Sequence, residues 1–132
     1  MHEHEKAARR ILRNMGFEEG DPETRLSPLG TQVLFRWDGV GITKDGASVV
    51  VEVEPANPNE GHVRLHVTNL ALQVHFQQGV NKLVWVVNSE SPSCHVQLKS
   101  YAECWAGLLS KALGHSLPPM EYRDIDGRTL VA

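Results

Sequence analysis

A run of mostly β-branched apolar residues, Ala47 to Val53, predicts a strand that is buried on both faces of a sheet. Carboxylates interrupt the end of this strand at Glu52 and Glu54. Burying an ionised carboxylate costs several kcal/mol unless a cation or a set of donors compensates its charge. No Lys or Arg lies between residues 45 and 63. We therefore expect a divalent metal ion to compensate these acids.

Asp38 opens the preceding strand, and the turn between the two strands decides whether it joins the acids. The turn signal spans Lys44 to Gly46. A two-residue turn would pair Asp38 with Val53, which puts Asp38 on the opposite face from Glu52. A three-residue turn, with its glycine in the left-handed conformation, would pair Asp38 with Glu52 on one face. The sequence suits both registers, and only the second builds a metal site.

Length and composition limit the class of protein to which these residues can belong. The 132 residues predict one domain, 1–132, with a substantial core. A net charge of −3 excludes the global basic field of a general nucleic-acid coat protein. Cys94 and Cys104 predict free thiols in a reducing compartment rather than a bridge. Because no apolar run approaches a membrane span and the N-terminus is charged, we expect a cytoplasmic protein.

Hydrophobic periodicity predicts an α/β domain around a mixed sheet flanked by helices. Three successive antiparallel strands follow the first helix, and Asp38-Gly39 makes a tight turn between the first two. Strand competes with helix over residues 62–68, where apolar residues alternate, and His95–Lys99 is a candidate strand. A turn at Asp126-Gly127 is a candidate for returning a last short strand to the sheet. The predicted elements are a helix over 3–16, a loop over 18–30, strands over 31–37, 40–44 and 47–54, a helix over 62–78, a strand over 83–87 and a helix over 101–113.

Glu5 lies in line with Ala8 and Leu12, at the edge of the apolar stripe of the first helix. It is therefore a candidate to point inward toward the acids, and Glu3 is a second candidate for the same role. The alternative is that either Glu favours the helix N-terminus or pairs with a basic residue one turn later. The sequence leaves both alternatives open.

This order of elements, with an Asp opening the second strand and an acidic doublet on the third, resembles the PD-(D/E)xK nuclease superfamily, which has the restriction-endonuclease-like fold. The resemblance covers roughly residues 3–88. It is carried by Glu5 on the first helix, by Trp37-Asp38 where the family has Pro-Asp, and by Glu52-Val53-Glu54 where the family has acid-x-Lys.

The resemblance implies a metal-dependent endonuclease that hydrolyses phosphodiester bonds of nucleic acid, with DNA as the expected substrate. It places Asp38, Glu52 and Glu54 in the catalytic centre. Asp38 and Glu52 would bind Mg²⁺ or Mn²⁺, with Glu5 assisting, and the metal would lower the pKa of a bound water. Oxygen ligands suit these ions. A chain of this size would cut both strands as a homodimer or within a larger complex.

One departure bears on activity, because Glu54 stands where the family has its Lys. Candidates to supply the missing cation are Lys82, Arg64 and Lys44. The alternative function is a catalytically weakened nuclease-fold module that binds nucleic acid or a protein partner. A third interpretation is a structural hairpin whose Glu52 and Glu54 face water.

Substrate contacts are also implied by the resemblance. Arg9 and Arg13, from a basic stripe on the first helix, would hold the nucleic-acid backbone, although such stripes are most often solvated. His66 and Gln73 share one face of the second predicted helix and would line the groove; the simpler alternative is a polar face beside solvent. His62 and His66, four residues apart, also suit a transition metal, but spacing places no third ligand near them.

Overall fold

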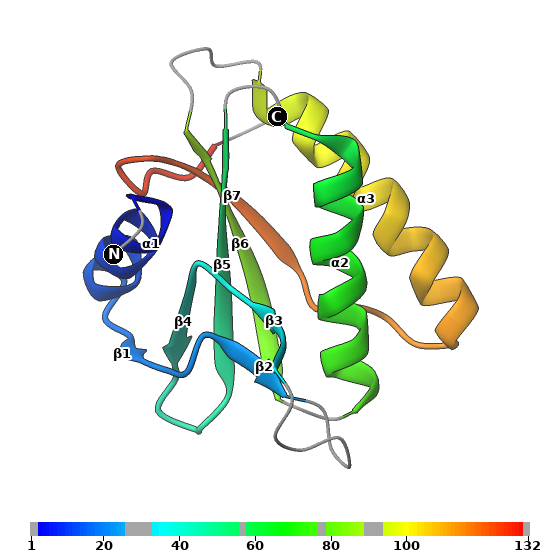
Figure 1. The fold of residues 1–132 in the computed structure, drawn as a ribbon, viewed down its shortest axis with the longest axis horizontal. Helices are drawn as coiled ribbons and strands as arrows, with labels where there is room; N and C mark the ends of the chain where they lie inside the picture. Colours follow the sequence, from blue (N-terminus) through cyan, green and yellow to red (C-terminus); the bar gives the residue numbers. More distant parts are fainter. Residues whose placement is uncertain (1–2, 26–32, 56–57, 77–78, 89–93, 131–132) are drawn as a thin grey trace.

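The computed structural model describes residues 3–25, 33–55, 58–76, 79–88 and 94–130. A five-stranded mixed sheet of order β1-β4-β5-β6-β7 forms the centre, and a second sheet pairs β2 with β3 (Figure 1). This arrangement confirms the predicted α/β domain with a mixed sheet flanked by helices. The elements are α1 (Glu3–Asn14), β1 (Glu18–Glu19), β2 (Glu23–Arg25), β3 (Val33–Arg36), β4 (Gly39–Ile42), β5 (Ser48–Pro55), α2 (Glu60–His75), β6 (Val80–Asn88), α3 (Cys94–Leu113) and β7 (Met120–Asp124).

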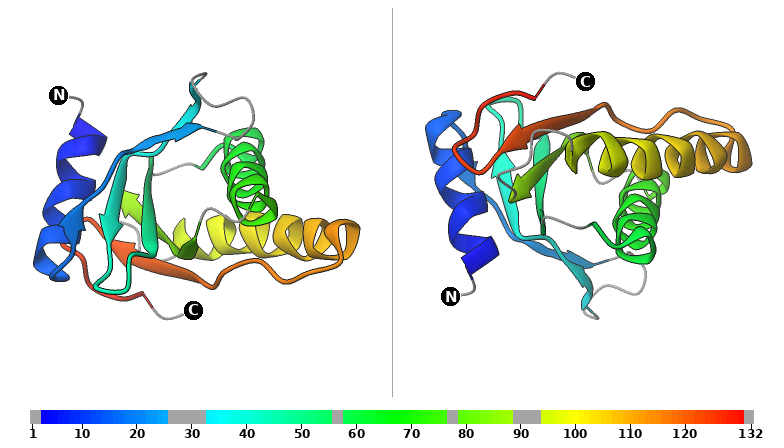
Figure 2. Two further views of the ribbon diagram at one scale, coloured as in Figure 1. Left: turned by 90° about the horizontal axis from the view of Figure 1, so that it is seen from below. Right: turned by 90° about the horizontal axis from the view of Figure 1, so that it is seen from above.

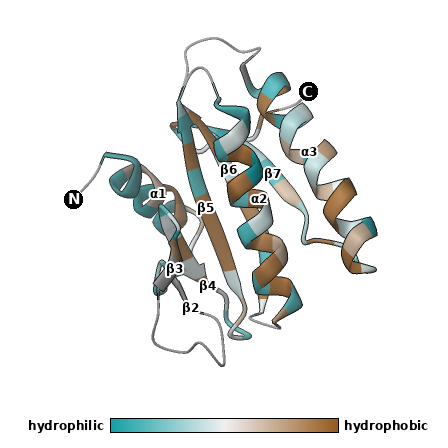
Figure 3. Ribbon diagram, turned by 45° about the vertical axis from the view of Figure 1, so that its right-hand side comes forward, coloured by the Kyte–Doolittle hydropathy of each residue, from teal (hydrophilic) through white to brown (hydrophobic). Residues whose placement is uncertain are grey.

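The helices cover opposite faces of the main sheet, α1 on one side and α2 with α3 on the other (Figure 2). Successive side chains of a strand point to opposite faces. Val49, Val51 and Val53 accordingly pack in the cluster that contains α1, whereas Val50 packs in the cluster that contains α2. The same alternation puts Glu52 and Glu54 on the α2 face. Figure 3 shows hydrophilic segments toward the C-terminal end of the otherwise hydrophobic β5.

The β4–β5 hairpin adopts the three-residue turn. Gly39 pairs with Val51 and Ile42 with Ser48, and the Thr43 N–H donates to the Ala47 carbonyl oxygen over 2.9 Å. Gly46 has a φ of 85°, the left-handed conformation that this turn needs. The three-residue register, which places Asp38 opposite Glu52, is therefore confirmed, with Asp38 itself in the bend that precedes β4.

The predicted meander of three strands is wrong in its first member. β3 pairs antiparallel with β2 in the separate sheet, and the chain bends at Asp38 to enter the main sheet instead of turning back on itself. The strand beside β4 is β1, which lies in the predicted loop over 18–30, as does β2. In the main sheet the order is still helix, three strands, helix, strand. Residues 26–32 lie outside the described part of the chain.

Residues 62–68 are helical, as the longer pattern predicts, and the competing strand is wrong. Asn59 caps α2, and its side chain accepts the His62 N–H over 3.1 Å. Val63 and Val67 are buried, but the intervening Leu65 is 54% exposed, which fits a helical period and not an alternating strand.

The candidate strand His95–Lys99 is also wrong, because these residues begin α3. His95, Leu98 and Ala102 are buried one helical turn apart, whereas Val96 is exposed. At the C-terminal end, the edge strand β7 precedes the Asp126-Gly127 turn and runs parallel to β6. After the turn only an isolated bridge joins Arg123 and Thr129 among the described residues.

Two remaining expectations concern membranes and thiols. No helix in the described part of the chain is both long and apolar enough to cross a membrane. Cys104 is an exposed free thiol, as expected. The side chain of Cys94 lies outside the described residues.

Close packing of α1 on β4 generates a stability prediction. A Cβ at Gly39 would lie 2.8 Å from the Cβ of Ala8, so Gly39→Ala forces the helix away from the sheet. We expect the free energy of unfolding in urea to fall by about 1–3 kcal/mol. Gly107→Ala on α3 is the control, because its added Cβ meets nothing within 4 Å beyond its chain neighbours and the nearby backbone of its own helix. Its free energy of unfolding should rise by about 0.5–1 kcal/mol. Equal stabilities for the two variants would contradict this account of the packing.

Candidate metal centre

Glu52 and Glu54 lie beneath α2 at the C-terminal end of β5, next to the parallel strand β6. Their exposed fractions are only 4% and 3%. His66, in the second turn of α2, lies between them. Its Nε2 is 3.3 Å from Oε2 of Glu52, and its Nδ1 is 3.1 Å from Oε1 of Glu54. Both acids therefore face the protein interior, and the interpretation of a hairpin with solvent-facing acids is wrong.

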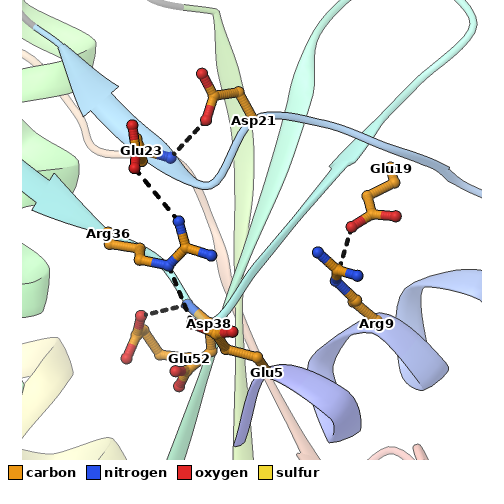
Figure 4. Close-up of polar contacts among 8 residues, drawn as sticks. All are labelled: Glu5, Arg9, Glu19, Asp21, Glu23, Arg36, Asp38 and Glu52. Carbon is orange, nitrogen blue, oxygen red and sulfur yellow. Dashed lines mark hydrogen bonds and ion pairs between the residues drawn. The ribbon is translucent and has the colours of Figure 1, made fainter. Parts of the chain in front are cut away.

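Asp38 and Glu52 are connected through the backbone at the start of β4. The Asp38 N–H donates to Oε1 of Glu52 over 3.0 Å, and the Val53 N–H donates to Oδ2 of Asp38 over 2.8 Å (Figure 4). Both contacts follow from the register of the hairpin, which places Asp38 beside the strand that carries Glu52. The two carboxyl groups are thus held side by side.

Burial raises the pKa of Glu52 to about 10, and the nearby Asp38 carboxylate adds to the shift. The charge of Glu54 acts in the same direction, while the Asp38 N–H acts against it. In the absence of a metal ion, Glu52 therefore holds a proton at neutral pH. A bound cation would replace that proton, because metal ligands must be deprotonated.

Glu5 reaches the same end of the sheet from α1. Its Oε1 accepts a hydrogen bond from Nε of Arg36 over 3.0 Å, and Nη1 of Arg36 lies 3.5 Å from Glu23. The bond to Glu5 is the main cause that raises the pKa of Arg36. Glu5, Arg36, Asp38 and Arg9 line one narrow pocket of about 10 Å³, about the size of one water molecule. Figure 4 shows Glu5 and Arg36 beside Asp38, and Arg9 paired with Glu19 farther along α1.

Glu3 does not share this position. Its side chain is 85% exposed and pairs with Lys6 one turn later on α1. Of the two acids, Glu5 therefore points inward, whereas Glu3 pairs with a basic residue along the helix.

The three cations that the sequence offered as replacements for the family's Lys have other partners or positions. Nζ of Lys82 lies 2.7 Å from Glu121. Arg64 pairs with Glu60 over 2.5 Å. Lys44 lies in the exposed β4–β5 turn, at the opposite end of β5 from the acids. Among contacts of the described residues, none of the three reaches Glu52 or Glu54.

Arg36 is the cation that sequence reasoning missed. It directly precedes Trp37-Asp38, at the end of β3, and this adjacency was the available signal. Its pairing with Glu5 could not be predicted from sequence spacing, because Glu5 lies on another element.

The helix face that carries His66 and Gln73 does not lie beside solvent. Gln73 is buried, and its Oε1 accepts the indole N–H of Trp37 over 3.0 Å. Asn69 is buried as well. Gln73 thus joins α2 to the bend at Asp38 and does not point into a groove. His62, the partner of His66 in sequence, is exposed.

Arg9 and Arg13 lie on the outer side of α1. Nε of Arg9 is 2.7 Å from Oε1 of Glu19. Both arginines line a surface hollow of about 550 Å³, together with Lys6 and Arg10. The hollow also contains Glu3, so its charge is predominantly but not wholly basic.

Comparison of the chain with protein-family models and with curated proteins gives no match. The functional argument therefore depends on the geometry of Asp38, Glu52, Glu54 and His66.

The buried carboxyl of Glu52 predicts a pH-dependent stability. Because its pKa in the folded protein lies above the ordinary value of 4.5, folding binds a proton, and the resulting stability is lost as pH rises from that value toward the raised pKa. Between about pH 6 and about pH 8, the free energy of unfolding of the metal-free protein should fall by about 3 kcal/mol more than that of Glu52→Gln. Urea titrations in the presence of a chelator measure this difference.

Glu3→Gln, which removes an exposed charge, is the control for that measurement. Wild-type protein and Glu52→Gln with the same pH dependence would show that Glu52 is ionised in the folded protein without metal.

Proposed function

We propose that the chain is a metal-dependent endonuclease of the PD-(D/E)xK type, with a restriction-endonuclease-like fold and DNA as its substrate. The observation that carries this proposal is the pair of carboxyl groups of Asp38 and Glu52, held side by side by two backbone hydrogen bonds. A pair of acids in one place, one of them with a strongly raised pKa, is typical of a functional site.

The order of elements supports the proposal. Along the chain, the main sheet and its helices follow the order α1, β1, β4, β5, α2, β6, with β2 and β3 inserted as a separate sheet. This is the order helix, three strands, helix, strand that the resemblance implies. Asp38 precedes the second of these strands, and Glu52 lies on the third.

Asp38 and Glu52 would hold Mg²⁺ or Mn²⁺, with Glu5 approaching from α1. The fit is supported by the all-oxygen donor set and by a buried acid that a proton keeps neutral without metal. A bound ion would lower the pKa of a water molecule and stabilise charge on the phosphate. The Asp38 N–H and the Val53 N–H fix the orientations of the two carboxyl groups.

Arg36 takes the place of the missing Lys in this proposal. Its guanidinium lies beside Glu5, in the pocket that Asp38 also lines. A substrate phosphate at the mouth of that pocket would compete with Glu5 and Glu23 for the guanidinium donors, which match phosphate oxygens in pairs. Arg9 and Arg13 would contact the nucleic-acid backbone from the surface of α1. Cutting of both strands would require a homodimer or a larger complex.

One observation favours the second candidate, a weakened relative that binds nucleic acid or a protein without cutting. In the described part of the chain, no Lys or Arg contacts Glu52 or Glu54, and both acids are almost fully buried. Asp38, which is half-buried, is more accessible to a substrate phosphate than either Glu. Measurement of strand cleavage separates the two candidates.

Nicking of supercoiled plasmid in Mg²⁺ or Mn²⁺ tests the proposed activity. Asp38→Asn keeps an acceptor for the Val53 N–H but removes the charge, and we expect it to lower the nicking rate about 100-fold or more, equivalent to about 3 kcal/mol in the barrier. Asp38→Ala is less suitable, because it would leave the buried Val53 N–H without its acceptor.

Asp126→Asn is the matched control, since Asp126 is exposed in the turn after β7. It should nick at the wild-type rate. Nicking by Asp38→Asn at that same rate would contradict the proposal. Wild-type protein that binds DNA in the presence of metal but never nicks it would favour the second candidate.

A further inference from the structure

Glu52, Glu54 and His66 form a ligand set that the proposed nuclease centre does not use as a whole. Each offers one atom, and these atoms lie within 4.8 Å of one another. Ligands at about 2.1 Å from a shared ion lie at most about 4 Å apart. The separations exceed this limit by less than an ångström, so a small rearrangement that includes rotation of the imidazole would bring one atom from each side chain to a shared ion.

The imidazole of His66 supplies a second observation that favours a bound ion at these groups. Both ring nitrogens face carboxyl oxygens. A neutral imidazole has only one N–H, so its other nitrogen must accept a proton or bind an ion. Nδ1 is buried and makes no hydrogen bond with any described residue, despite its 3.1 Å separation from Oε1 of Glu54. Buried polar atoms without a partner are rare in folded proteins, so Nδ1 is the candidate ligand atom of the imidazole.

Aromatic rings enclose the imidazole and limit access of water. The ring centroids of Phe35, Trp85 and Trp37 lie 5.2, 5.8 and 6.3 Å from that of His66. In such surroundings the two acids could both be ionised only at a high cost in free energy, which a cation bound between them would remove.

We propose that Glu52, Glu54 and His66 bind a divalent first-row transition-metal ion, of the kind of Mn²⁺, Fe²⁺, Co²⁺ or Zn²⁺, in preference to Mg²⁺. One nitrogen and two carboxylates form a mixed ligand set that these ions accept, whereas Mg²⁺ favours oxygen and retains its water. The proposal extends the proposed function and rests on it only through the shared Glu52. It needs neither Asp38 nor a nucleic acid.

This site gives Glu54 a role. In the family that the chain resembles, a Lys stands at this position, and a cation there would repel a metal ion bound by His66. The carboxylate of Glu54 instead completes the set with His66, which α2 holds directly above it. The departure from the family pattern and the position of His66 thus have one common explanation.

Titration with Co²⁺, followed by its visible absorption and by tryptophan fluorescence, tests the site without any substrate. Trp37 and Trp85 adjoin the proposed site, so Co²⁺ bound there should quench their emission. We expect His66→Gln and Glu54→Gln each to weaken Co²⁺ binding at least about tenfold, or about 1.4 kcal/mol. His62→Gln, which changes an exposed histidine of the same helix, should bind as wild type does.

Asp38→Asn distinguishes this site from the nuclease centre. We expect the Asp38→Asn protein to keep the Co²⁺ signal. A large excess of Mg²⁺ should not displace Co²⁺ from this variant. If neither the wild-type protein nor any variant nicks plasmid, but the Co²⁺ signal depends on His66, the nuclease proposal is rejected and the metal site is supported. Urea titrations establish that each variant is folded.

Three outcomes would overturn the metal site. The first is wild-type protein that binds no Co²⁺. The second is Co²⁺ binding that neither His66→Gln nor Glu54→Gln weakens. The third is equal loss in Asp38→Asn and His66→Gln, which would place the ion at the nuclease centre.

Discussion

Desolvation of two carboxyl groups on one face of β5 is the constraint on which the rest of the site depends. The alternation of the strand puts Glu52 and Glu54 on the same side as Val50, beneath a helix that excludes water. Groups so placed need protons, donors or a cation. His66 above them and the Asp38 N–H beside them are the compensation that the described residues provide.

The two sides of the sheet balance charge in different ways. On the α1 side, Glu5 has a permanent cation in Arg36, and both remain partly accessible to solvent. On the α2 side, the described residues offer the acids an imidazole and the Asp38 N–H but no permanent cation, and burial gives Glu52 a pKa high enough to keep its proton. Asp38 lies where these two regions meet. The two proposals therefore divide naturally: a phosphate would approach the accessible side, and a transition metal would occupy the enclosed side.

Sequence patterns predicted the elements better than their pairing. The apolar run of β5 and the periodicity of α1 and α2 depend on nearby residues, so they could be read directly. The register of the hairpin could not be chosen, because a left-handed glycine fits both turns, and pairing along the whole of β4 decides between them. The short strands β1 and β2 carry too few residues for any periodicity.

Contacts within the site were also harder to predict from the sequence than the elements that carry them. His62 offered His66 a partner four residues away, but the actual neighbours of His66 are on β5, more than ten residues distant in sequence and adjacent only after α2 packs on the sheet. Arg36 was missed for a similar reason, because its partner Glu5 lies on another element. Spacing within one helix or strand predicts which residues share a face, whereas contacts between elements depend on packing that no local pattern contains.

The hydrogen bond between Trp37 and Gln73 has a mechanical consequence. It fastens the bend that precedes Asp38 to the same helix that carries His66. A sliding movement of α2 over the sheet would therefore displace the imidazole and pull on the bend together. Helix α2 thus links the accessible side of the site, at Asp38, to the enclosed side, at His66. A ligand that restricts motion on one side would therefore restrict motion on the other.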